Sequence, residues 1–226
     1  MSETTPTGTP SPGGDPPSPV PRKRVNRRER ILRTAAEVFA AQGFNNTSLA
    51  DIAATLDITP AGVLHHFGSK TELLTAVLEL RDTNDPAPSG AGMLDHLVTT
   101  AERNAARPGT TRLYAVLSAE SATARHPAQD WFRDRYTVLR REVEEAVLDR
   151  IGPEHREMAN TPGPDGHTPA HSAATAILAA MDGLQVQWLL DPESVDMATV
   201  TELVIDALVA RLRTTEGGGP SGPVQT

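Results

Sequence analysis

The chain has 226 residues, a formal net charge of −8 and no cysteine. A chain of this length forms one medium-sized domain or two small ones, each with a buried core. The absence of cysteine excludes a disulfide scaffold and thiolate catalysis, and no apolar run predicts a membrane span. We therefore expect a cytoplasmic protein.

The charge is distributed unevenly along the chain. Residues 20–33 hold seven basic side chains and one acidic side chain, whereas residues from 83 onward hold 12 basic and 20 acidic ones. A basic segment attached to an acidic body is typical of a protein that contacts nucleic-acid phosphates at one end only. The alternative interpretation is a solvated charged surface that has no partner.

Residues 1–24 form a Pro/Thr-rich arm that ends in the first basic residues. Such a segment buries too little apolar surface to offset its ordering entropy, so we expect disorder. The arm is a candidate to follow the minor groove or the backbone of DNA. The tail, residues 214–226, is rich in glycine and is also expected to be disordered.

Residues 25–84 have the apolar spacing of a small helical domain. A first helix is predicted over about 26–42, with Ile31, Ala35 and Phe39 on one face and Gly43 as its C-terminal stop. We expect Phe44 to pack beneath the helices that follow. Another helix is predicted over about 71–81. Its apolar face contains Leu73, Leu74, Val77 and Leu80.

Between these helices, residues 47–70 read TSLADIAATLDITPAGVLHHFGSK. Thr47 and Ser48, with Asp51 three residues after Ser48, predict the cap of a short helix. Asp57 stands where the chain must turn, and Asp tolerates the left-handed conformation better than most residues. The face that the short helix is expected to bury consists of Leu49, Ile52, Ala53 and Leu56.

A second short helix is predicted to begin with Thr59 as its cap and Pro60 at its first position. Its inward residues are Val63 and Phe67. Small residues at a helix N-terminus allow it to approach base edges closely, and the helix dipole favours phosphate there. The residues left on the outer face are Thr59, Ala61, Gly62, Leu64, His65 and His66. Ser69 and Glu72 predict a capping box for the next helix, beside Lys70.

This arrangement, with its HHFGSK ending and the helix that starts at TELL, resembles the DNA-binding domain of the TetR family of bacterial transcriptional regulators over about residues 25–82. Two positions depart from the family pattern. Asp57 stands where the turn often has Gly, and Leu64 stands where Tyr is common, so a hydroxyl that could reach a phosphate or base is missing. Leu64 can still contact a thymine methyl group.

The resemblance implies roles for particular residues. Arg27, Arg28, Thr47, Ser48 and Lys70 are expected to contact phosphates, and the outer face of the second helix is expected to contact base edges. The residues assigned to base edges are Thr59, Pro60, Ala61, Gly62, Leu64 and His65, and His66 is expected to contact a phosphate or a base. A histidine pair exposed to solvent without a partner is the alternative for His65 and His66, which diverge on a helix and cannot form a metal pair.

Beyond a boundary at 83–90, only helical periodicity is found, which predicts an all-α protein. Helices are predicted near 91–106, 110–125, 128–151, 169–190 and 195–213, with a long loop before 169. The last two are apolar over most of their circumference, so they need cover on more than one side. The resemblance implies that they form a four-helix interface in a homodimer, and that residues 91–213 bind an effector.

An effector pocket in a helical bundle is mostly apolar with a few polar anchors. The candidate lining residues are Tyr114, Trp131, Phe132, Tyr136, Met181 and Trp188, and ordinary core packing is the alternative for each. His167 and His171 have a metal-like spacing, but Thr168 and Pro169 place His167 outside the helix, so no zinc site is expected. We expect no cofactor, and no nucleophile, base or phosphate loop indicates an enzyme.

The sequence therefore predicts a helix-turn-helix regulator with a helical effector-binding and dimerisation domain. The function expected is a repressor that binds a palindromic double-stranded DNA operator as a homodimer and is released by a small molecule. An activator of the same fold is one alternative, because polarity depends on where the operator lies. A small-molecule carrier or enzyme that uses the helical cavity is the other.

Overall fold

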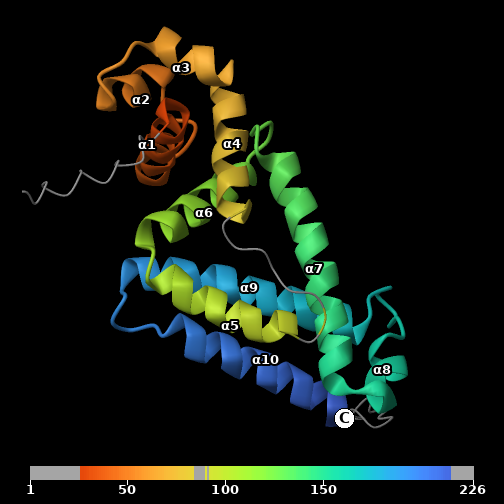
Figure 1. Cartoon of the computed structure of the whole chain (residues 1–226). Helices are drawn as coiled ribbons and strands as arrows, with labels where there is room; N and C mark the ends of the chain where they lie inside the picture. The colour runs from red at the N-terminus through yellow and green to blue at the C-terminus, as the bar shows by residue number, and fades with distance from the viewer. Residues whose placement is uncertain (1–25, 84–89, 91, 215–226) are drawn as a thin grey trace, which may run out of the picture.

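Ten helices and no strand make up the computed structural model over the residues it describes, which are 26–83, 90 and 92–214 (Figure 1). The arm (1–24) and the tail beyond Thr214 lie outside the described residues. The N-terminal helices are α1 (Arg27–Gln42), α2 (Leu49–Thr55), α3 (Pro60–Phe67) and α4 (Lys70–Thr83). The remaining helices are α5 (Gly92–Ala105), α6 (Pro108–Ser121), α7 (Gln129–Ile151), α8 (Pro153–Ala159), α9 (Pro169–Leu190) and α10 (Met197–Thr214). The all-α prediction is confirmed.

The caps predicted for α2 and α3 are present, and α1 is capped as well. Asn26 Oδ1 accepts a hydrogen bond from the Arg28 amide at 3.2 Å. Ser48 and Asp51 form a reciprocal capping box at the start of α2. Thr59 Oγ1 accepts from the Gly62 amide at 3.2 Å, with Pro60 in the first turn of α3. These side chains satisfy amides that have no partner within their helices.

The turn between α2 and α3 is left-handed at Asp57, with φ of 53°. The sequence predicted this conformation for the position that family members often fill with Gly. Asp is among the residues that adopt it at low cost. The departure from the family pattern at Asp57 therefore leaves the helix-turn-helix geometry intact.

The C-terminal helices form layers below the N-terminal group. Figure 1 shows α5, α9 and α10 stacked over one another, α7 running down one side, and α8 at the end farthest from α3. Helix α8 was not predicted from the sequence. It starts with Pro153 after Gly152, whose φ of 92° ends α7, so the Gly-Pro pair breaks one helix and starts another. The long loop follows α8 and reaches Thr168, the cap of α9.

Helix α9 is the central helix of the lower layers. By length and composition alone it is apolar enough to cross a bilayer, which the sequence-based expectation of no membrane span overlooked. In the structure, however, it packs against α6, α7 and α10. The residues that it buries are Ala170, Ala173, Ala174, Ile177, Leu178, Met181, Leu184, Gln185 and Trp188. An apolar circumference is what such a covered helix requires.

The N-terminal helices and the body share one hydrophobic core. Ile31, Phe39 and Leu73 belong to the same buried cluster as Leu117 of α6 and Phe132 of α7. Helix α6 packs against α1, and Figure 1 shows it between the N-terminal group and the layers of α5 and α9. A change in the position of α6 must therefore displace α1 or open the shared core, because close-packed interiors do not deform smoothly.

A polar contact reinforces this junction. Glu120 near the end of α6 accepts hydrogen bonds from the backbone amides of Phe44 at 2.6 Å and Asn45 at 3.3 Å. The Phe44 ring lies 5.7 Å from that of Phe39 and 5.2 Å from that of His126. Phe44 therefore packs at the junction with α6, within the buried cluster that also contains Ile52 of α2 and Val63 of α3.

His126 completes the junction from the loop before α7. Its Nδ1 accepts a hydrogen bond from the Ala128 amide at 3.2 Å, and its Nε2 lies 4.0 Å from Glu120 Oε2. Burial lowers the pKa of the His126 imidazole, although the Glu120 carboxylate opposes that shift. The imidazole is therefore held neutral near pH 7.

We predict that Glu120→Ala destabilises the protein by about 1–3 kcal/mol, because it leaves the amide of buried Phe44 without a hydrogen-bond acceptor. Urea unfolding followed by circular dichroism measures the change. Glu102→Ala on α5, whose side chain is exposed, is the control and should stay within about 0.5 kcal/mol of wild type. Equal stability of the two variants would contradict a structural role for the Glu120 contact.

Candidate nucleic-acid interface and internal cavity

Helix α3 lies at the end of the molecule opposite α8 and α10 (Figure 1). It is anchored on its inner side by Val63, which has no exposed surface, and by Phe67, which is 5% exposed. Both belong to the shared core. The helix therefore presents one fixed face away from the body, as a helix that enters the major groove must.

The outer face of α3 contains the residues that the sequence assigned to base contacts. Thr59, Pro60, Ala61, Leu64 and His65 are exposed, while Gly62 and His66 are partly exposed. The first turn carries small side chains, and Leu64 and the two imidazoles follow. The rings of His65 and His66 contact edge to face, with centroids 5.4 Å apart.

Gly62 occupies an open position on this face. A Cβ atom built there would meet only Thr59 Oγ1, at the ordinary contact distance of 3.5 Å. The backbone of α3 therefore does not require glycine at this position. Because glycine has no side chain, it allows a binding partner to approach the surface of α3 closely.

The residues assigned to phosphate contacts are not equally placed for that role. Arg27, Arg28 and Ser48 are exposed, and the Arg28 guanidinium lies 4.8 Å from the centroid of the Phe67 ring. Thr47 is different, being 3% exposed, with its hydroxyl donating to the Gly43 carbonyl oxygen at 2.7 Å. The side chain of Thr47 thus closes the turn after α1, and its assignment as a phosphate ligand is wrong because it is buried.

Lys70 lies at the start of α4, beside the junction described above. Its Nζ is 4.0 Å from the centroid of the Phe44 ring, a cation–π contact. Partial burial lowers the pKa of the Lys70 ammonium, while Glu120 and Asp51 favour its charged form. Lys70 therefore connects the surface near α3 electrostatically with α6.

A cavity of about 500 Å³ lies where the N-terminal helices meet the body. Its walls come from six helices: α1, α4, α5, α6, α7 and α9. Ala36 of α1 and Val77 and Leu80 of α4 contribute to them, so the N-terminal group forms part of the wall. The volume falls in the range of pockets that hold small organic ligands, roughly 300–1,000 Å³.

Polar groups are set into the largely apolar wall. The Tyr136 hydroxyl donates to Asp182 Oδ2 at 2.5 Å. Burial raises the pKa of Tyr136, and neighbouring Tyr114 and Asp182 add to the shift, so the phenol stays protonated. The side chains of Asn104 and Gln185 lie in the wall and are also buried.

Half of the aromatic and methionine residues predicted for the pocket line the cavity, namely Tyr114, Tyr136 and Met181. The other three do not. Phe132 is buried in the shared core, with Trp131 packed against its ring at a centroid distance of 4.9 Å. Trp188 packs in a separate cluster with Ala101, Leu184 and Met197. For Trp131, Phe132 and Trp188 the alternative of ordinary core packing holds.

Sequence reasoning missed the polar part of the wall, including Asp182, Gln185, Asn104 and Arg103. One signal was available, because Asp182 is the single acidic residue in a helix that is otherwise apolar or neutral over 22 residues. A lone acid within such a helix is either paired or functional. The remaining polar residues carry no comparable signal.

The histidines of the long loop and α9 form a local contact. The rings of His167 and His171 stack at 4.8 Å, and His171 Nδ1 lies 3.3 Å from Glu144 Oε2. Within the described part of the chain, no group of three or more potential metal-binding side chains comes together.

The outward face of α9 and α10 carries large apolar side chains in solvent. Val186, Leu190 and Leu203 are 48%, 82% and 65% exposed. Exposed small residues on the same two helices include Ala176, Ala179 and Ala207. Large exposed apolar side chains on two long, mutually packed helices are typical of an interface with another protein surface.

Comparison with known proteins identifies the N-terminal part of the chain. Residues 31–77 match the family described as "Bacterial regulatory proteins, tetR family". The HTH-type transcriptional regulator TtgR of Pseudomonas putida is 29% identical over 196 residues, which cover 82% of this chain and 91% of TtgR.

Solved structures share the whole fold. NalD, described as the secondary repressor of the MexAB-OprM multidrug efflux pump in Pseudomonas aeruginosa, is 21% identical with a TM-score of 0.60, over 81% of this chain and 94% of NalD. A SmeT–triclosan complex is 18% identical with a TM-score of 0.63, over 88% of this chain and 99% of SmeT. With the helix-turn-helix geometry of α2 and α3 and the family match over it, these likenesses lead to one conclusion: residues 31–77 form a DNA-binding domain of the type found in the TetR family of bacterial regulators, and the chain as a whole is similar to HTH-type transcriptional regulators.

Proposed function

We propose that this regulator is a repressor that binds a palindromic DNA operator as a homodimer and leaves it when a small molecule fills the internal cavity. The observation that carries the proposal is the position of the cavity, whose wall includes α1 and α4 of the DNA-binding helices. NalD, a fold relative, is described as a repressor, and SmeT was solved with triclosan bound.

The coupling follows from packing. Helix α4 begins with Lys70, directly after α3, and its Val77 and Leu80 lie in the cavity wall seven and ten residues later. A helix turn advances about 5.4 Å, so a ligand that displaces this end of α4 tilts α3 at the other end. A ligand that binds the tilted state better shifts the population toward it, in proportion to its differential affinity.

The homodimer is supported by the exposed apolar face of α9 and α10. Two copies related by a twofold axis would bury Val186, Leu190 and Leu203 against the same face of the partner. The pair of α3 helices would then contact successive major grooves, about 34–36 Å apart along the DNA. A tilt that changes their spacing lowers operator affinity without any unfolding.

Gel shifts with the DNA upstream of the protein's own gene test this function, with two variants at Gly62. Gly62→Gln should lower operator affinity at least about tenfold because its side chain obstructs the groove. Gly62→Ala adds only one carbon atom and should lower operator affinity much less. Both should fold, since a Cβ there meets no clash. Full operator affinity of Gly62→Gln would exclude α3 as the element in the groove.

Lys70 is expected to contact a phosphate in the complex. Lys70→Ala should weaken binding to every duplex and lower the slope of log affinity against log salt by about 0.9 for each phosphate that the lysine neutralises. Arg112→Ala on α6, an exposed cation remote from α3, is the matched control. A slope unchanged from that of the control would place Lys70 outside the interface.

The dimer is tested on α9. Val186→Asp should convert the protein to single chains of 24.1 kDa in light scattering, because the charge would be buried without a partner in the dimer. Operator affinity should fall with it. Val138→Asp introduces the same charge at a similarly exposed valine of α7 and should leave the mass unchanged. A dimer that survives Val186→Asp would require another interface.

A further inference from the structure

Two side-chain amides of the cavity wall have no hydrogen-bond partner among the residues that the structure describes. Asn104 near the end of α5 is 8% exposed, and Gln185 of α9 is 5% exposed. The hydrogen bonds found at these two residues involve backbone atoms only. Their side-chain polar atoms retain accessible surface, and both residues line the cavity. The amides are therefore open to a ligand in the cavity.

A buried amide without a partner is unfavourable. A carboxamide that leaves water without gaining a new hydrogen bond loses free energy, and buried polar groups in proteins are normally paired. Leucine or methionine would fill the same space without that cost. Two such amides on the wall of one cavity therefore indicate a site for a molecule that supplies the missing hydrogen bonds.

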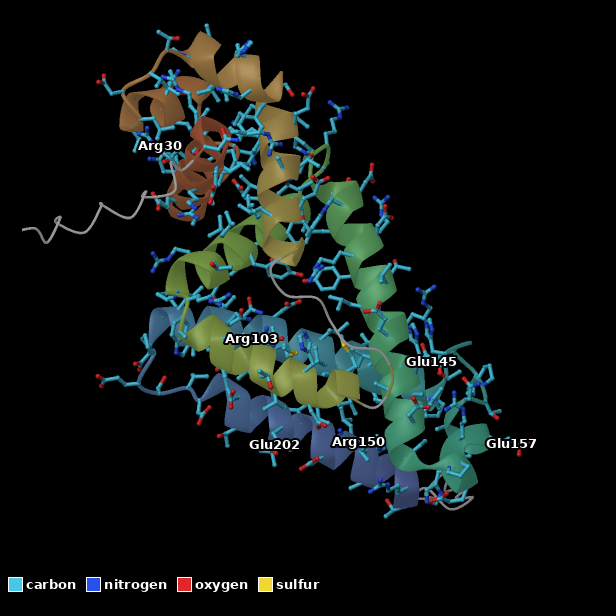
Figure 2. All side chains as sticks on the ribbon, in the orientation of Figure 1. Arg30, Arg103, Glu145, Arg150, Glu157 and Glu202 are labelled. Atoms are coloured by element: carbon cyan, nitrogen blue, oxygen red, sulfur yellow. The ribbon has the colours of Figure 1, made fainter. Side chains whose placement is uncertain are left out.

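The backbone that carries Asn104 is fixed to α6. Thr111 of α6 is 1% exposed, and its hydroxyl donates to the Asn104 carbonyl oxygen at 2.8 Å. The Arg107 amide donates to the same oxygen at 3.1 Å. Arg103, labelled in Figure 2, lies at this end of α5, which leads into α6. A ligand bound to Asn104 is thus held beside the start of the helix that packs against α1.

Gln185 enters the cavity wall from a second helix, because α9 packs against α5. Each carboxamide offers an N–H₂ donor and a carbonyl acceptor, so the two helices together present donors and acceptors of both kinds. The aliphatic part of the same wall includes Leu97, Leu139, Leu178 and Met181. A matching ligand buries an apolar body against these side chains and directs one hydrogen-bonding group toward the amides.

Charged side chains in the same wall interact with other parts of the protein. Arg33 pairs with Glu29 at 2.5 Å, and Asp182 accepts from the Tyr136 hydroxyl at 2.5 Å. These contacts give no reason to assign a net charge to the ligand. The groups that lack partners are uncharged, and a neutral ligand group pairs with them without the cost of dehydrating an ion.

We propose that the cavity binds an uncharged ligand that has an apolar body and a head group that both donates and accepts hydrogen bonds, such as a carboxamide or a lactam. Asn104 and Gln185 bind that head group. The proposal rests on the proposed function only in taking this cavity as the effector site. The head-group preference is a property of the free protein, so it can be measured without DNA.

Three probes with the same alkyl chain isolate the head group: octanamide, heptyl methyl ketone and octanoate. Calorimetric titration into the full-length protein gives the affinities. We expect octanamide to bind about tenfold more tightly than the ketone, which accepts hydrogen bonds but donates none. It should also bind more tightly than octanoate, which must lose the hydration of its charge. Equal or tighter binding of the ketone or of octanoate, or no binding of octanamide, overturns the proposal.

Variants locate the head group. Asn104→Leu and Gln185→Met keep the approximate size of each side chain and remove its amide. Each should weaken octanamide about threefold to tenfold, the loss expected for one neutral hydrogen bond, and leave the ketone unaffected. Gln187→Met makes the same change at an exposed position of α9 and is the control. Octanamide binding unchanged in both cavity variants would overturn the assignment.

Thermal unfolding of the free protein gives a second measurement. Neither cavity variant should lower the unfolding temperature, because the amide that it removes makes no hydrogen bond within the described part of the chain. A lower unfolding temperature would show that the amide has a structural partner, and it would overturn the assignment for that residue.

Gel shifts with the upstream DNA separate this inference from the proposed function. If octanamide binds with the expected preference while the protein ignores that DNA, the ligand class stands and the repressor proposal fails. If the protein binds the DNA and does not prefer octanamide, the repressor proposal stands and the ligand class fails. If octanamide binds as expected and leaves DNA affinity unchanged, the ligand class stands but the cavity does not release the operator.

Discussion

The core shared by α1 and α6 is the constraint on which the arrangement of this protein depends. Phe39, Phe44 and Leu117 bury one continuous apolar surface, and Glu120 fixes the loop after α1 through two backbone amides. The N-terminal helices are therefore not a separate module on a linker. Their orientation is set by the body, and a perturbation of the body reaches them through close packing rather than through a mobile hinge.

The cavity lies beside this shared core, between the N-terminal helices and the body. It touches α1 and α4 on one side and α5, α7 and α9 on the other, so a molecule in it would contact the N-terminal helices and the body at once. Coupling over such a short path needs no extended network of residues. Lys70 adds an electrostatic element, because Glu120 lies close enough to favour its charged form and belongs to the helix that the cavity borders.

The helix-turn-helix was predictable because its signals are local. Ser48 with Asp51, Asp57, and Thr59 with Pro60 each determine backbone geometry within a few residues, and the structure contains all of these features. Burial was harder to predict. Threonine is a residue type typical of an exposed helix cap, yet tertiary packing buries the side chain of Thr47. The cavity was hard to predict because its wall is formed by residues from six helices. The size of an aromatic side chain does not indicate whether Trp131 or Trp188 lines a cavity or packs against neighbouring side chains. Only Asp182, a lone acid in an apolar helix, indicated that part of α9 has a polar environment.

Helix α4 serves two purposes with one set of side chains. Val77 and Leu80 form part of the cavity wall, and the same helix carries Lys70 and supports α3. Under the proposed function, selection for a new inducer that alters these two positions would also alter operator affinity, so the two traits could not diversify independently there. Adapting this regulator as a biosensor is therefore best done by varying α5, α7 and α9 while keeping α4 unchanged.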